Sequence, residues 1–326
     1  MTANDAFVPA DEQMHRFDPD VWSWNESWYF SWIDHAGGPS GFFRLGVLPN
    51  QQRAMLWCYV HRDGAWLGSE ETRLALGDLD LAHGVAHQKW ALRFAVRPEA
   101  ALRSGNLTFE GPLRVLSGPE AGAFSNVAFE LATTATSDCF GTGTGSDTGR
   151  GEFVASRFEQ SIRVDGRYTE GGRSREIHAT GHRDRSWGPR NWRIAFALGD
   201  LQSPAGQLYF VGAPQLGGAG VGYLRDASGM RHLRCVDGAI AYDDARRTLA
   251  KSQLGFATDD GKRLDVELAP IAPSVCFEMA HTCEPPEHWP YWRALVEARV
   301  SGWPAPARGW FEANRYGIVR EPRAAR

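Results

Sequence analysis

The chain has 326 residues, 43% of them hydrophobic and 23% charged, which is typical of a globular protein with one large or two ordinary domains. Its 35 basic and 39 acidic residues give a net charge of −4, so charge gives no reason to expect nucleic acid or an anionic membrane as a partner. No apolar run approaches the roughly 20 residues of a membrane span, and the polar first residues lack the apolar core of a signal peptide.

The first predicted element is a strand over residues 22–32. Its alternate positions carry five aromatic residues and one acid, in the order Trp22, Trp24, Glu26, Trp28, Phe30 and Trp32. Period-two spacing of aromatic residues favours a strand. Trp24, Trp28 and Trp32, which are four residues apart, would also fit one face of a helix. A carboxyl group among aromatic rings is costly to ionise, so we expect a raised pKa and a general-acid role for Glu26.

Further short alternating runs follow along the whole chain. They cover residues 90–96, 127–131, 154–164, 192–198, 221–223, 264–268 and 294–300. Gly and Asp-Gly turn signals separate them, and no long amphipathic helix is evident. The pattern predicts an all-β protein with enough strands for two closed antiparallel barrels. We place the domain boundary in the polar stretch near residue 175, which gives domains 1–175 and 176–326.

A second dense motif lies at residues 181–192, GHRDRSWGPRNW. An Asp beside several Arg residues ordinarily ionises easily, with a lowered pKa. Asp184 is therefore open to two interpretations. It is either part of an active site or an ion-pair partner of Arg183 or Arg190 that fastens the junction of two barrels.

This motif resembles the HxDxxWG signature of carotenoid 1,2-hydratase and AttH-like proteins, which have two lipocalin-like domains. It is similar also to the GxRDxSWGxRxW core of a bacterial branch of that superfamily, together with WNES at residues 24–27 and an aromatic-Glu-Gln segment at 158–160. The resemblance spans roughly residues 20–320 and implies two tandem lipocalin-like antiparallel β-barrels with the signature near their junction. Two departures are Arg185, where the hydratases have His, and Asn191, where the branch has Asp.

In the hydratases the signature Asp is implicated in protonating an alkene of an isoprenoid, so the resemblance gives this role to Asp184, with Trp187 beside it. The chemistry that we predict is cofactor-independent hydration, dehydration, cyclisation or isomerisation of a hydrophobic, isoprenoid-like or polycyclic small molecule. A protonated Glu26 or Asp184, acting singly or as a pair, donates the proton, and the faces of Trp24, Trp28 and Trp187 stabilise the cation. The enzyme would then be a hydro-lyase or an isomerase or cyclase.

Two other functions stay open. One is a non-catalytic carrier of an apolar ligand, because barrels of this type hold ligands readily. The other is a barrel junction with no ligand role, in which Asp184 only stabilises the fold. We expect a monomer or a homodimer.

The remaining candidates come from the strand at residues 154–164 and from the signature. Gln160 shares a predicted inward face with Phe158, whereas Glu159 is expected to face water, and the resemblance marks both. The predicted substrate-binding residues are Trp24, Trp28, Glu159, Gln160, His182, Trp187, Arg190 and Trp192.

No metal site is predicted. His83 and His87 lack a third ligand and read as a surface pair, and the spacing of His281, Cys283 and His288 is irregular. The sequence has no G-x-S-x-G, H-E-x-x-H or Rossmann fingerprint. The five cysteines form no C-x-x-C pair, so we expect reduced thiols and a cytoplasmic location.

Overall fold

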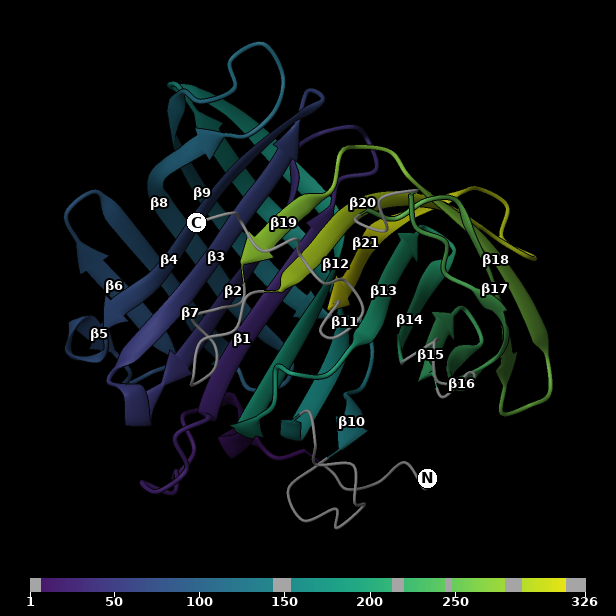
Figure 1. Cartoon of the computed structure of the whole chain (residues 1–326), viewed down its shortest axis with the longest axis horizontal. Coiled ribbons are helices and arrows are strands. Elements are labelled where there is room, and N and C mark those ends of the chain that lie inside the picture. The colour runs from purple at the N-terminus through teal and green to yellow at the C-terminus, as the bar shows by residue number, and fades with distance from the viewer. Residues whose placement is uncertain (1–6, 143–153, 213–219, 244–247, 279–288, 315–326) are drawn as a thin grey trace, which may run out of the picture. The chain divides into compact units, whose positions relative to one another are not determined.

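The computed structural model describes residues 7–142, 154–212, 220–243, 248–278 and 289–314 (Figure 1). Within these ranges the regular structure is β-strand apart from three short 3-10 turns, η1 (Pro9–Glu12), η2 (Pro49–Gln51) and η3 (Leu76–Asp78). The all-β prediction is therefore confirmed. None of the helical segments in the described part of the chain has the length or the apolar run needed to cross a bilayer.

The chain divides into two compact units, Met1–Asn191 and Trp192–Arg326. The predicted boundary near residue 175 falls instead within the first unit, just after a hairpin turn. Gly171 and Gly172 form that turn with φ angles of +55° and +78°, a conformation that glycine adopts without steric cost. The polar stretch that resembles a linker is thus the exposed tip of a long hairpin.

The first unit is a closed eight-stranded antiparallel barrel. Pairing runs in the order β11–β12–β1–β2–β3–β4–β8–β9 and returns to β11, while β10 pairs with β11 and a short sheet of β7, β6 and β5 extends from β8. The strands are β1 (Trp24–Ile33), β2 (Ser40–Leu48), β3 (Arg53–Arg62), β4 (Ala65–Ala75), β5 (Leu79–Asp80), β6 (Val85–Lys89), β7 (Leu92–Ala100), β8 (Ser104–Val115), β9 (Phe124–Ala135), β10 (Phe140–Thr142), β11 (Val154–Glu170) and β12 (Arg173–Arg190). Closure satisfies the backbone groups that an open sheet edge would expose.

Alternating side chains from these strands fill the inside of the first barrel. Trp28, Phe30 and Trp32 of β1 belong to this core, as the alternating pattern predicts for a strand. The other face of β1 is buried as well, although it carries polar residues such as Asn25 and Ser27. A strand that is buried on both faces and carries polar groups on one of them is unusual, because buried polar groups need hydrogen-bond partners.

The second unit also closes into a ring of eight antiparallel strands. Pairing runs β18–β17–β16–β15–β14–β13–β21–β20 and returns from β20 to β18, with β19 paired to β20. The strands are β13 (Phe196–Ser203), β14 (Gly206–Gly212), β15 (Val221–Asp226), β16 (Gly229–Ala239), β17 (Ser252–Thr258), β18 (Arg263–Pro270), β19 (Val275–Glu278), β20 (Pro290–Val300) and β21 (Ala307–Asn314). Its core is aliphatic and aromatic, with Leu208, Phe256 and Phe311 among its members. The prediction of two tandem barrels is confirmed.

Candidate active site

Three neighbouring strands of the first barrel bring the sequence motifs together. The WNES segment lies on β1, the signature on β12 and the aromatic-Glu-Gln segment on β11, in the order β1–β12–β11. Glu26 pairs with Trp187, whereas Asp184 pairs with Tyr29 on one side and Glu159 on the other. Because side chains alternate along a strand, the motifs are divided between the two faces of the sheet.

Glu26 and Asp184 therefore point to opposite faces. Glu26 lies on the core side with Trp28, and Asp184 lies on the opposite side with Tyr29. Proton transfer between catalytic groups needs hydrogen-bond distance or one bridging water, and a sheet separates these two carboxyl groups. The prediction that they act as a pair is wrong.

Glu26 is fully buried and lies in a dense set of hydrogen-bond donors. Its Oε2 is 2.5 Å from Nη2 of Arg185 and 3.1 Å from Nδ1 of His15, and the indole of Trp24 donates to Oε1 at 3.2 Å. Burial acts to raise the pKa of Glu26, but the charge of Arg185 and the contact with His15 outweigh it, and the pKa is lowered. The prediction of a raised pKa is wrong because the sequence does not reveal this guanidinium.

Arg185 occupies the place predicted for a substrate cation. Its guanidinium carbon lies 3.9 Å from the centroid of Trp28 and 5.7 Å from that of Trp187. Its Nη atoms donate to the carbonyl oxygens of Ser27, Ser186 and Gln13, a set of contacts that fixes a buried cation. The rings of Trp28 and Trp187 therefore bind a cation, as expected, but this cation is the guanidinium of Arg185 and not a substrate.

His15 completes this cluster from the segment that precedes β1. Its ring stacks on Trp187 with centroids 4.1 Å apart and planes 7° apart, and its Nε2 lies 3.5 Å from Asp11. Sequence analysis missed both His15 and the role of Arg185. The one available signal was the substitution of Arg185 for the His of the hydratase signature.

Gln160 points to the core side, as predicted, and acts as a hydrogen-bond anchor. Its Nε2 donates to the carbonyl oxygens of Leu102 and Ser137, and its Oε1 accepts from Nε of Arg183 at 2.7 Å. Arg183 is ion-paired with the buried Glu12 of η1 at 2.8 Å. Arg183 and Arg185 thus fix the N-terminal segment to the barrel.

Asp184 lies among charged groups on the other face of the sheet. Its Oδ2 is 3.0 Å from Nη2 of Arg157, whereas its Oδ1 is buried and accepts no hydrogen bond from the described residues. Burial raises the pKa of Asp184, the positive charge of Arg157 opposes this, and the neighbouring carboxylate of Glu159 adds to it. The net pKa is raised, so this carboxyl group retains its proton to a higher pH than an exposed Asp.

Glu159 and His182 form a buried pair beside Asp184. Nε2 of His182 lies 2.6 Å from Oε2 of Glu159, and Arg157 contacts the other carboxylate oxygen. Only 2% of Glu159 is exposed. The prediction that this side chain faces water is wrong, because the outer face of the barrel is buried here too.

The other predicted residues divide between three locations. Arg190 lies on the Asp184 face, donates from Nη1 to the hydroxyl of Ser186 at 3.2 Å and adds positive charge near Asp184. Trp24, Trp28 and Trp187 lie with Glu26, so the structure does not bring them to Asp184. Trp192 begins the second unit, where its ring packs edge-on against a tyrosine.

Comparison with known proteins places the chain in a family. The family model described as a domain of unknown function, DUF7064, matches residues 8–316. The chain belongs to this family. No curated protein matches the sequence at a significant level.

Solved structures share the fold of this DUF7064 member at low sequence identity. A protein assigned as AttH from Nitrosomonas europaea is 14% identical with a TM-score of 0.59, over 97% of this chain and 98% of that one. Kievitone hydratase from Nectria haematococca is 14% identical with a TM-score of 0.55, over 96% and 94% of the two chains. CghA, determined with Sch210972, is 14% identical with a TM-score of 0.52, over 89% and 87%. The resemblance to the AttH-like proteins is confirmed at the level of the fold.

The described residues include no group of three or more side chains able to hold a metal ion. His83 is exposed, but His87 is buried and stacks on Phe94, so the expected surface pair is wrong. The other histidine and cysteine candidates, at positions 281, 283 and 288, lie outside the described residues.

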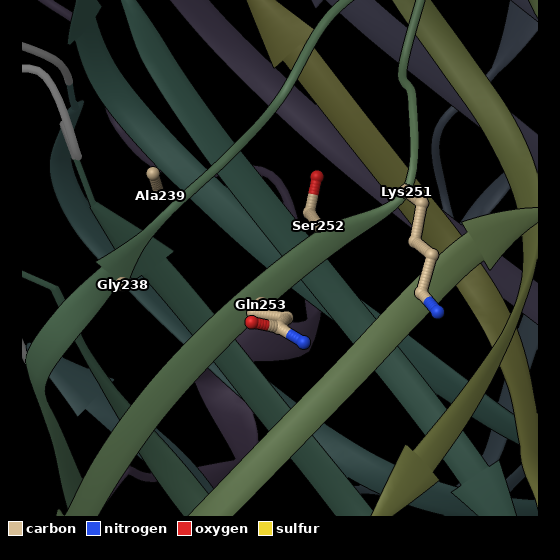
Figure 2. Close-up of a pocket in the computed structure, with 5 residues that line it drawn as sticks. All are labelled: Gly238, Ala239, Lys251, Ser252 and Gln253. Carbon is tan, nitrogen blue, oxygen red and sulfur yellow. The ribbon is translucent and has the colours of Figure 1, made fainter.

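A surface depression on the second unit contains none of the predicted site residues. It is open to solvent and lined by Gly238, Ala239, Lys251, Ser252 and Gln253, where β16 ends and β17 begins (Figure 2).

The cysteines that the structure describes are all free thiols. They are Cys58, Cys139, Cys235 and Cys276.

Proposed function

We propose that this protein is an enzyme that protonates a hydrophobic small molecule from Asp184 and thereby catalyses hydration or the reverse dehydration. The observation that carries the proposal is the environment of this carboxyl group. Its pKa is raised, and its Oδ1 is buried without a hydrogen bond from the described residues. A general acid needs both a retained proton and a free oxygen from which to transfer it.

The proposed reaction balances without a cofactor. The O–H of neutral Asp184 adds its proton to one carbon of an alkene, which leaves a carbocation on the substrate and a carboxylate on the protein. Water adds to the cation, and the proton that the bound water then releases returns to Asp184. The sum is alkene plus water to alcohol, and the same steps in reverse describe dehydration. Loss of a proton or ring closure from the same cation gives isomerisation or cyclisation instead.

The neighbouring groups suit this sequence of charges. The carboxylate formed on Asp184 is stabilised by Arg157 at 3.0 Å, and Arg190 lies close enough to affect it. The pair of His182 and Glu159, whose atoms are 2.6 Å apart, can accept and return the proton of the attacking water. Tyr29 pairs with Asp184 across β1 and β12, and its ring centroid lies 6.3 Å from that of His182, so an aromatic ring able to stabilise a cation lies beside the acid.

An isoprenoid-like substrate is the class that best fits proton transfer from a carboxylic acid. Protonation of its trisubstituted alkene gives a tertiary cation, which is far easier to form than a primary or secondary one. Two of the similar structures are of a hydratase and of a protein determined with a small molecule, Sch210972, and they support small-molecule chemistry on this fold. Because a shared fold does not fix function, the proposal depends on the Asp184 site and not on these names.

The test is Asp184→Asn with Asp165→Asn as a matched control. Asp165 also lies on the signature hairpin and also contacts an arginine, but its side chain is 43% exposed. We expect Asp184→Asn to retain its fold. Its turnover of an isoprenoid-like alkene that the wild type converts should fall by about 100- to 10,000-fold, the range for removal of a general acid. Asp165→Asn should behave as wild type.

A non-catalytic carrier gives a different result in the same experiment. Both variants would then bind an isoprenoid ligand as the wild type does, and no preparation would convert it. Equal turnover by wild type and Asp184→Asn would also contradict the proposal, because another group would then supply the proton.

A further inference from the structure

Asn25 is a buried amide with no hydrogen-bond partner among the described residues. The residue has 0% of its surface exposed, and neither Oδ1 nor Nδ2 makes a hydrogen bond there. It lies on β1 opposite Gly188 of the signature, on the same face of the sheet as Asp184. Buried polar atoms almost always have a partner, so an amide with both atoms unpaired in the protein is a candidate ligand contact.

The residues between Asn25 and Asp184 are small. Ser27 of β1 lies between Gly46 of β2 and Ser186 of β12, and this row separates Asn25 from the row of Asp184. Four residues along a strand correspond to roughly 13 Å. The face therefore has an acid at one end and an unpaired amide at the other, and the row between them has small residues on its backbone.

Arg44 pairs with Tyr29, in the row of Asp184, and its guanidinium reaches over Gly46 toward Asn25. A Cβ on Gly46 would lie 2.8 Å from Nη1 of Arg44 and 3.0 Å from Oδ1 of Asn25, so glycine at this position allows both groups to approach. The guanidinium also lies over Trp57, with its carbon 4.8 Å from the ring centroid. A guanidinium near the side-chain amide of Asn25 favours an acceptor oxygen of a ligand, above all a carboxylate.

We propose that Asn25 binds the oxygen-bearing end of the substrate, a carboxylate or carbonyl group, while Asp184 protonates an alkene near the other end. This inference rests on the proposed function and narrows its substrate class. The substrate is an apolar chain with an acceptor oxygen roughly 10–13 Å from the alkene that reacts. Nδ2 of Asn25 donates the hydrogen bond, and the adjacent guanidinium of Arg44 attracts the charge.

The first arm of the experiment measures the melting temperature of Asn25→Leu without any ligand. Leucine has nearly the shape of asparagine, so it removes the cost of an unpaired buried amide, and we expect a rise of about 2 °C or more. The control is Asn106→Leu, because Nδ2 of Asn106 donates to Glu99 at 2.6 Å. That variant loses a made hydrogen bond and should not rise.

The second arm measures binding of farnesoic acid and of farnesene by tryptophan fluorescence. The two probes share a fifteen-carbon chain and differ in the carboxylate. We expect the wild type to prefer the acid, and Asn25→Leu to lose about tenfold in affinity for the acid with little change for the hydrocarbon. Asn106→Leu should keep the preference of the wild type.

Three results would overturn the role of Asn25. They are an unchanged preference in Asn25→Leu, a wild type that binds the hydrocarbon as tightly as the acid, and a melting temperature of Asn25→Leu that falls below that of Asn106→Leu. The last result would mean that the amide is bonded in the free protein, for example to a structural water only. Different results in the same binding experiment test the proposed function itself. Asp184→Asn should bind farnesoic acid as the wild type does, and a wild type that binds neither probe would overturn the isoprenoid class itself.

Discussion

Removing the charge of Glu26 by Glu26→Gln tests whether this residue is structural. Its carboxylate contacts Arg185 at 2.5 Å, and the two side chains are 0% and 1% exposed. Breaking a buried ion pair by removal of one partner costs about 3–5 kcal/mol, because the other charge stays buried. Arg185 keeps three backbone carbonyl acceptors and the ring of Trp28, so we expect the lower end, about 3 kcal/mol.

Thermal and urea unfolding measure this loss directly. For a unit of this size about 3 kcal/mol corresponds to a fall in melting temperature of roughly 6–12 °C. The double variant Glu26→Gln with Arg185→Met should recover part of the loss, since it removes both buried charges. Below the transition, folded Glu26→Gln should retain turnover. A Glu26→Gln variant as stable as the wild type would refute the structural role of Glu26. A variant that is stable but inactive would indicate a catalytic role instead.

The pH dependence of the same variant has a definite sign. The folded-state pKa of Glu26 is lowered, so its stabilising contribution is fully present above its ordinary pKa and is lost as the pH falls through the lowered value. Glutamine does not titrate. The difference in stability between wild type and Glu26→Gln should therefore narrow as the pH falls below about 4, and a constant difference would contradict the ion pair.

Three further predictions concern other contacts of the first barrel. Glu12→Gln should lower the stability by about 1–3 kcal/mol, measured by urea unfolding, because it weakens the ion pair with Arg183; no change would mean that the N-terminal segment is not fixed there. Asp184→Asn should gain stability relative to wild type as the pH rises, since a raised pKa makes folding less favourable once the carboxyl ionises; thermal melts from pH 4 to 9 that stay parallel would contradict this. Gly46→Ala should displace the guanidinium of Arg44 and weaken binding of farnesoic acid but not of farnesene, and equal binding by variant and wild type would count against the crowding.

The fold follows from local patterns that the sequence carries. Alternation in the aromatic strand predicts which of its side chains point inward, and Trp28 and Trp32 are in the core as expected. The same rule places Gln160 on the inner side. The polar stretch near residue 175 does not mark the domain boundary, because a hairpin tip and a linker share the same glycine-rich, charged composition.

The site was harder to predict because it depends on strand register. Arg185 lies opposite Trp28, although the two are separated by more than 150 residues in the chain, and this pairing reverses the expected pKa of Glu26. Alternation also says which side of the strand Glu159 takes, but not that this side is buried. Resemblance to the hydratase signature supplied Asp184 where periodicity alone could not.

The central claim is that Asp184 is a carboxylic acid whose pKa is raised above the ordinary value for aspartate. The direct measurement is a carbon-13 NMR titration of the side-chain carboxyl groups, with the Asp184 signal assigned by its absence from Asp184→Asn. We predict a titration midpoint above the reference value of about 3.9, whereas the exposed Asp165 in the same spectrum should titrate below it because of its contacts with His178 and Arg163. A midpoint for Asp184 at or below that reference would make it an ordinary ion-pair partner of Arg157 and would contradict the proposed proton transfer.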